Sequence, residues 1–115
     1  MQREPAAPSI SPDEAVQRVA EGALLLDVRE PDEWAAGHAP EARHVPLAAL
    51  AARAGELDPE TPVVCVCRVG GRSERAAMVL RQRGFDAVNL GGGMQAWAAA
   101  GLPVVGDAGA PGTVI

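Results

Sequence analysis

Lysine is absent from this 115-residue chain, and all ten of its basic side chains are arginines. Acidic residues number 15, which gives a formal net charge of −5. Nucleic acids and anionic membranes bind basic protein surfaces, so neither is an expected partner. Aromatic residues are also scarce, with only Trp34, Trp97 and Phe85 present. Since 48% of the residues are hydrophobic, the sequence predicts one folded domain with an aliphatic core.

Cysteine is nearly absent too, with only Cys65 and Cys67, which are separated by one residue. A disulfide between them would need strained geometry, and nothing resembles a disulfide framework. No apolar run is long enough to span a membrane, and residues 1–10 lack the apolar segment of a signal peptide. We therefore expect a cytoplasmic protein in a reducing environment, where a free thiol can work.

Strand-like and helix-like segments alternate along the chain. Ser11, Pro12 and Glu14 form a helix start signal, with an N-cap, a proline at the first helical position and a capping-box glutamate, and that helix ends at Gly22. Further helices are expected at 31–36, 46–54, 72–83 and 94–100, and strands at 23–28, 44–45, 61–66 and 87–90. This alternation predicts an α/β fold, with a mostly parallel sheet and helices on both faces.

A buried strand delivers Cys67 to a glycine-containing loop, after which a helix begins; the segment reads Cys67-Arg68-Val69-Gly70-Gly71-Arg72-Ser73. The N–H groups of such a loop and the positive end of the helix can form an anion site. Gly70 and Gly71 allow the backbone torsions that this requires, and Arg68 and Arg72 add positive charge. These features lower the pKa of a cysteine and make its thiolate a nucleophile. The alternative is a structural cysteine beside a turn with solvated arginines.

Further side chains are candidates for supporting this loop. Arg72 would hold it in shape by pairing with a buried carboxylate, and Asp27, at the end of its own strand, is the obvious partner. Ser73 would cap the helix or donate to the thiolate. Arg29 would add to the local positive field or remain a surface charge. Cys65 is expected to be inert core, with a resolving thiol as the alternative.

Three segments, in order, resemble the signature motifs of the rhodanese family. The segment from Cys67 to Ser73 resembles its active-site loop. The first signature is matched by Asp27-Val28-Arg29-Glu30, Glu33-Trp34, Gly37-His38-Ala39-Pro40 and Val45-Pro46-Leu47. The C-terminal one is matched by Leu90-Gly91-Gly92-Gly93-Met94, Trp97 and Gly101-Leu102-Pro103. The domain would span residues 9–104, with flexible ends at 1–8 and 105–115. Glu41 departs from the family pattern, which usually has glycine there.

The resemblance implies a rhodanese-like fold with a five-stranded parallel sheet, and a sulfurtransferase activity. The Cys67 thiolate would take the outer sulfur from a donor such as thiosulfate and release sulfite, which is a good leaving group. The Cys67 persulfide would then pass its sulfur to cyanide or a thiol. The resemblance implies neither a metal nor an organic cofactor, and a sulfur-relay protein is a further candidate partner.

Three other interpretations are weaker. Phosphatases that share this fold have one more residue between the cysteine and the closing arginine, so the shorter loop favours a sulfur-sized reacting centre. A metal site built from Cys65, Cys67, His38 and His44 lacks the spacing of zinc sites. In the family signature His38 orders its loop, and His44 is expected at the surface. A non-catalytic binding or thiol redox-sensing domain of the same fold remains the main alternative.

Overall fold

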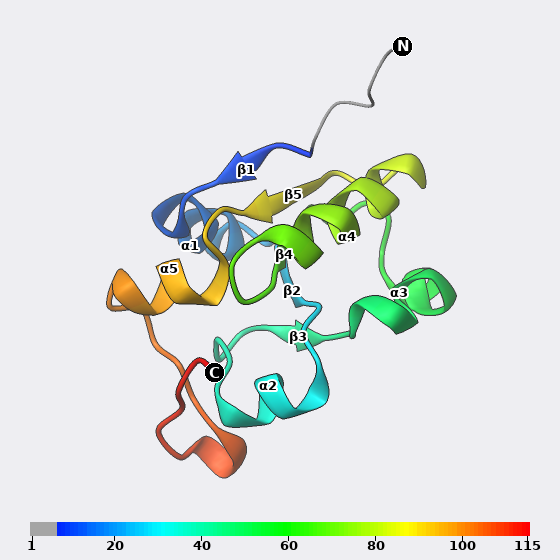
Figure 1. Ribbon diagram of the computed structural model, residues 1–115. Helices are drawn as coiled ribbons and strands as arrows, with labels where there is room; N and C mark the ends of the chain where they lie inside the picture. Colours follow the sequence, from blue (N-terminus) through cyan, green and yellow to red (C-terminus); the bar gives the residue numbers. More distant parts are fainter. Residues whose placement is uncertain (1–6) are drawn as a thin grey trace.

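Five parallel strands form the centre of the computed structural model, which describes residues 7–115 (Figure 1). They are β1 (Ser9–Ile10), β2 (Leu24–Asp27), β3 (Arg43–His44), β4 (Val63–Val66) and β5 (Ala87–Leu90). Their order in the sheet is β1-β5-β4-β2-β3, and every neighbouring pair is parallel. The predicted α/β fold with a five-stranded sheet is thus confirmed. The sequence did not reveal β1, because its two residues carry no apolar pattern.

Five α-helices connect or flank these strands: α1 (Pro12–Ala20), α2 (Pro31–Ala36), α3 (Leu47–Arg53), α4 (Gly71–Gln82) and α5 (Gly93–Ala99). Short 3₁₀ helices follow at Ala54–Glu56 (η1) and Asp107–Gly109 (η2). The predicted start signal of α1 is present, because the Ser11 hydroxyl accepts a hydrogen bond from the Glu14 amide at 3.2 Å. The helices α3, α4 and α5 differ from the predicted bounds by one residue at each end.

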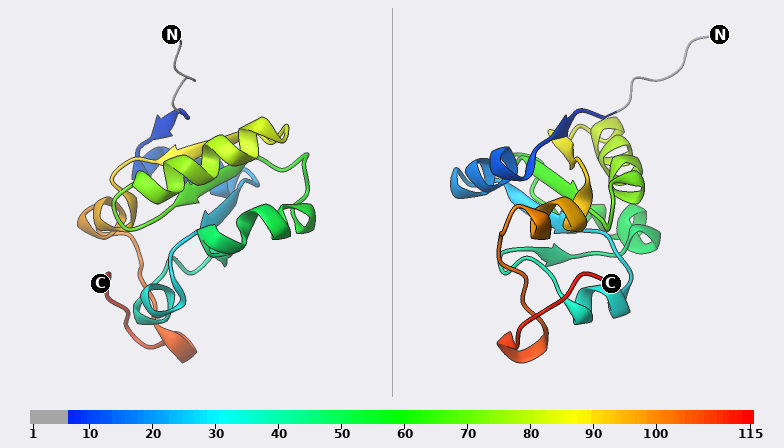
Figure 2. Two further views of the ribbon diagram at one scale, coloured as in Figure 1. Left: turned by 45° about the vertical axis from the view of Figure 1, so that its right-hand side comes forward. Right: turned by 60° about the vertical axis from the view of Figure 1, so that its left-hand side comes forward.

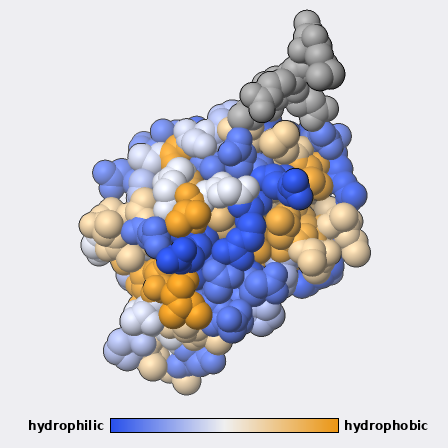
Figure 3. All heavy atoms as spheres, viewed as in Figure 1, coloured by the Kyte–Doolittle hydropathy of each residue, from blue (hydrophilic) through white to orange (hydrophobic). Residues whose placement is uncertain are grey.

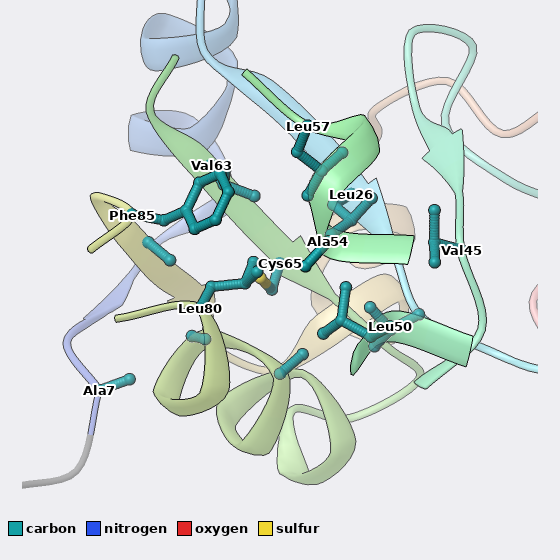
Figure 4. Close-up of a cluster of buried hydrophobic side chains, with 14 of the residues drawn as sticks. Ala7, Leu26, Val45, Leu50, Ala54, Leu57, Val63, Cys65, Leu80 and Phe85 are labelled. Atoms are coloured by element: carbon teal, nitrogen blue, oxygen red, sulfur yellow. The ribbon is translucent and has the colours of Figure 1, made fainter. Parts of the chain in front are cut away.

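The helices cover both faces of the sheet, as Figure 2 shows. Side chains alternate between the two faces along β4. Cys65 belongs to a cluster under α3 and α4 that includes Leu50 and Leu80, and part of this cluster is drawn in Figure 4. Val64 belongs to a second cluster, under α1 and α5, that includes Trp97. The strands are apolar on both faces because each face is covered by helices.

The two ends of the described chain make defined contacts. Ala7 is buried, and the carbonyl oxygen of Pro8 accepts a hydrogen bond from the amide of Asn89. At the other end Val105 forms a bridge with His38, and the Thr113 amide donates to the carbonyl of Ala36 at 2.9 Å. The expected flexibility of 105–115 stays a prediction, although the segment lies against α2. The same expectation covers residues 1–8; residues 1–6 lie outside the described residues, and for Ala7 and Pro8 the expectation stays a prediction.

Candidate active site

Cys67 lies between β4 and α4, at the carboxyl end of the central strand (Figure 1). Its side chain is almost fully buried, with 1% exposed. The amide of Gly70 donates to the Cys67 sulfur at 3.1 Å, and the hydroxyl oxygen of Ser73 lies 3.2 Å from the same atom. Gly70 has a φ of 119°, a left-handed conformation that glycine adopts without strain. The predicted loop therefore directs hydrogen-bond donors at the sulfur.

The surroundings of the two thiols shift their pKa values in opposite directions. Burial raises the pKa of Cys67, but hydrogen bonds from the Ser73 side chain and from the amides of Ser73, Gly70 and Val69 outweigh it, so that the pKa lies below its ordinary value. Cys65 has no exposed surface, and burial, together with the nearby Cys67, raises its pKa to about 12. The structure therefore makes Cys67 the more readily ionised of the two thiols and keeps Cys65 protonated.

Arg72 does not pair with Asp27, so that prediction is wrong. Its Nη1 and Nη2 atoms form a bidentate ion pair with Glu33, at 2.6 and 2.8 Å. Glu33 lies on α2, and Arg72 lies in the first turn of α4, so the pair joins two helices through residues 39 positions apart in the sequence. The carboxylate of Asp27 is not available, because it is held by Arg29.

Asp27 and Arg29 form an ion pair in which neither residue has exposed surface. The Nε atom of Arg29 lies 3.0 Å from Asp27 Oδ1, and Nη2 donates to Asp27 Oδ2 at 2.8 Å and to the carbonyl of Gly37 at 2.7 Å. Among the described residues, Nη1 of Arg29 has no partner. The expectation that Arg29 is a surface charge is therefore wrong. The pair connects the end of β2 to the end of α2.

A stability measurement against pH tests the Glu33–Arg72 pair. Hydrogen bonds from Arg72 lower the pKa of Glu33 from 4.5 to about 2. A carboxyl with a lowered pKa in the folded state stabilises the fold above its unfolded pKa and loses this contribution as pH falls. We expect the stability of the wild type to fall between pH 4.5 and about 2, and that of Glu33→Gln to fall less in this window. Urea unfolding at several pH values checks this, and equal losses would contradict it.

The first turn of α5 supports the Cys67 loop from the other side. The amide of Met94 donates to the carbonyl of Cys67 at 2.7 Å, and that of Gln95 donates to the carbonyl of Arg68 at 3.0 Å. Gly93 has a φ of 58°, and a Cβ atom there would collide with the same two carbonyl oxygens. Sequence reasoning identified the glycine run as a motif but not as a support of this loop, which depends on how α5 packs.

Gly93→Ala therefore has a specific expected cost. Gly101 provides the control, because its φ of 79° is also positive but a Cβ there would meet open space. We expect Gly93→Ala to lower the free energy of unfolding by about 1–3 kcal/mol more than Gly101→Ala does, since only the first forces backbone atoms apart. Chemical denaturation of both variants measures the difference, and equal costs would show that the close approach to the loop is unimportant.

The outer side of the loop faces solvent. Arg68 is exposed and Val69 is 53% exposed, whereas Gly70 is buried. Figure 3 shows hydrophilic residues over much of the face that carries α4, with hydrophobic residues in separate small patches. Arg68 thus lies on the solvent-facing side of the loop.

The two histidines stack with the ring of Trp34, which is a structural role that the sequence did not show. The ring of Trp34 lies against His38 at a centroid distance of 3.6 Å and against His44 at 4.9 Å. His38 Nδ1 lies 2.8 Å from the carbonyl oxygen of Trp34, and His44 Nε2 lies 2.7 Å from that of Arg29. His44 is therefore partly buried rather than a surface residue. Within residues 7–115, no three His, Cys, Asp or Glu side chains are grouped so that they could hold a metal.

The fold and the site thus define an α/β protein that holds a cysteine of lowered pKa at the carboxyl end of a central parallel strand. The family model for the rhodanese-like domain matches residues 11–100, and the chain belongs to that family. None of the helices in residues 7–115 combines the length and apolar character needed to cross a bilayer.

Relatives support the same assignment. A sulfurtransferase of Allochromatium vinosum is 43% identical over 96 residues, which cover 81% of this chain and 90% of that protein. A rhodanese-related protein of Thermoplasma volcanium superposes with a TM-score of 0.80 at 31% identity, covering 85% of this chain and 97% of that one. A rhodanese-like domain protein of Staphylococcus aureus gives a TM-score of 0.73 at 33% identity, with coverages of 78% and 90%. Sulfur transfer is the general activity that these similarities support.

Proposed function

We propose that this protein is a sulfurtransferase that carries sulfane sulfur as a persulfide on Cys67. The observation that supports this best is the pair of hydrogen-bond donors on the Cys67 sulfur, the Gly70 amide at 3.1 Å and the Ser73 hydroxyl at 3.2 Å. They lower the pKa of Cys67 and so favour its thiolate form. The sulfurtransferase from Allochromatium vinosum adds the reaction class.

The proposed donor is thiosulfate. The Cys67 thiolate attacks its outer sulfur, a new S–S bond forms, and the bond to the sulfite group breaks, so that sulfite leaves with both electrons of that bond. The product is a Cys67 persulfide anion, with the same negative charge as the thiolate. Arg68 would attract the incoming anion, and the loop amides would stabilise the charge on sulfur.

In the second half of the reaction, cyanide or a thiol is the proposed acceptor. Cyanide attacks the outer sulfur of the persulfide, thiocyanate leaves, and the Cys67 thiolate is restored. A protein of a sulfur relay is a further candidate for either partner. A reducing cytoplasm suits this cycle, because it keeps Cys67 free to react.

Intact-protein mass measurement after incubation with thiosulfate tests the proposal. The expected result is a mass gain of one sulfur atom that disappears on addition of cyanide, and peptide mapping should place that sulfur on Cys67. A gain located on Cys65, or no gain with any small sulfur donor, would overturn it. Loading without turnover above that of a free thiol would favour the binding or redox-sensing alternative instead.

A further inference from the structure

The hydroxyl group of Ser73 has one proton and three acceptors around it. Its oxygen lies 2.6 Å from Asn89 Oδ1, 3.2 Å from Cys67 Sγ and 3.3 Å from the carbonyl oxygen of Gly70. Ser73 has no exposed surface, so bulk water does not replace any of these partners. Only one acceptor can receive the proton in the best geometry, and the shortest distance is to Asn89.

Asn89 is held in place for this contact. It lies on β5, opposite Cys65 of β4 and Ser9 of β1, and it is only 4% exposed. Its Nδ2 atom donates to the hydroxyl of Ser9 at 3.2 Å, which leaves Oδ1 facing Ser73. A buried amide with both of its ends engaged in hydrogen bonds has a defined orientation.

We propose that Asn89 is a positioning residue that controls, through the Ser73 hydroxyl, how readily the Cys67 sulfur holds a negative charge. When Cys67 is a thiol, Ser73 donates to Asn89, and the Ser73 oxygen can accept the S–H proton. When Cys67 releases that proton to solvent, the hydroxyl turns toward the sulfur and gives up its bond to Asn89. Asn89 and the sulfur therefore compete for one proton.

This competition gives Asn89 a role in the reaction, and that consequence rests on the proposed function. In the resting thiol, Asn89 keeps the buried hydroxyl satisfied. After sulfur loading, the same hydroxyl can turn to the inner or the outer sulfur of the persulfide anion. Asn89 thus sets the balance between the resting thiol and the ionised form of Cys67 without touching the reacting atoms.

Other charged or titratable groups near Cys67 remain unchanged when Asn89 is substituted. The elements β5 and α5 contribute no charged side chain. The loop, α4, β4, β2, α2 and the connection between β2 and α2 contribute the following: Arg68, Arg72, Glu74, Arg75, Cys65, Asp27, Glu33, Arg29 and Glu30. A change in the ionisation of Cys67 on substitution of Asn89 that disappears in the Ser73→Ala background is therefore attributable to the hydroxyl.

A double-mutant cycle between Asn89 and Ser73 tests the inference. All variants carry Cys65→Ala, so that Cys67 is the only thiol, and the alkylation rate with iodoacetamide is followed from about pH 5 to about pH 10. Asn89→Leu keeps the size of the side chain and removes the acceptor. We expect its profile to move to lower pH, with a rate about threefold to tenfold higher below the midpoint, the range set by one neutral hydrogen bond. Ser73→Ala should move the profile to higher pH.

The decisive comparison is Asn89→Leu in the Ser73→Ala background, where it should have no effect. Any of three results for Asn89→Leu would overturn the inference. The profile could shift equally in both backgrounds, stay unchanged in the Ser73 background, or shift to higher pH. Asn89→Ala carries the same expectation and replaces Asn89→Leu if that variant does not give the circular dichroism spectrum of the wild type. The titration needs no sulfur donor, so its failure is distinguishable from failure of the proposed sulfur transfer.

Discussion

Cys67→Ser is expected to lower the rate of thiocyanate formation from thiosulfate and cyanide by at least about a thousandfold. A serine hydroxyl is not ionised near neutral pH, and an oxygen atom in place of the sulfur cannot form the persulfide. The fold should persist, since serine is close to cysteine in size and can still interact with Gly70 and Ser73. Steady-state turnover, with circular dichroism as the check on folding, measures this effect.

Cys65→Ala is the matched control, because it removes the other thiol of the chain. Cys65 is fully buried, and its raised pKa of about 12 keeps it protonated. We expect turnover to remain largely intact, with only a modest loss of stability from the smaller side chain. If Cys65→Ala were inactive and Cys67→Ser active, the persulfide would form on Cys65, and our assignment of it to Cys67 would be wrong.

Asp27→Asn is expected to lower the free energy of unfolding by roughly 3–5 kcal/mol. The substitution keeps the shape of the side chain but removes the charge that compensates the guanidinium group of Arg29. Since neither residue has exposed surface, water cannot take over that role. Urea unfolding measures the loss.

Two controls separate this effect from an ordinary loss of a charge. Arg18→Gln breaks the exposed ion pair with Glu14, and we expect it to cost less than about 1 kcal/mol. The double variant Asp27→Asn with Arg29→Met removes both buried charges and should be more stable than Asp27→Asn alone. If Asp27→Asn cost no more than Arg18→Gln, the buried pair would not be a support of the fold.

The buried pair matters for the site because of where it lies. It joins the end of β2 to the carbonyl of Gly37, immediately after α2, and α2 carries Glu33. Glu33 in turn holds Arg72 at the start of α4. Asp27 and Arg29 therefore support the cysteine loop through the position of α2.

The sequence by itself determined the features that depend on local patterns. The apolar runs at β2, β4 and β5, the start signal at Ser11 and the glycines after Cys67 each favour one backbone conformation over a few consecutive residues. From these alone the fold class and the position of Cys67 between a strand and a helix could be predicted. The buried Cys65 also follows from its place in that pattern.

Only the tertiary structure decided which side chains meet. The sequence does not determine which acidic residue pairs with Arg72. The packing of α2 against the start of α4 brings Glu33, and not Asp27, to its guanidinium group. The contact between Ser73 and Asn89 requires β5 to lie beside β4, with α4 above both. The physical reason is that local propensities define individual strands and helices, whereas the pairing of hydrogen-bonding and charged groups depends on the order of strands and on the packing of helices across long stretches of chain.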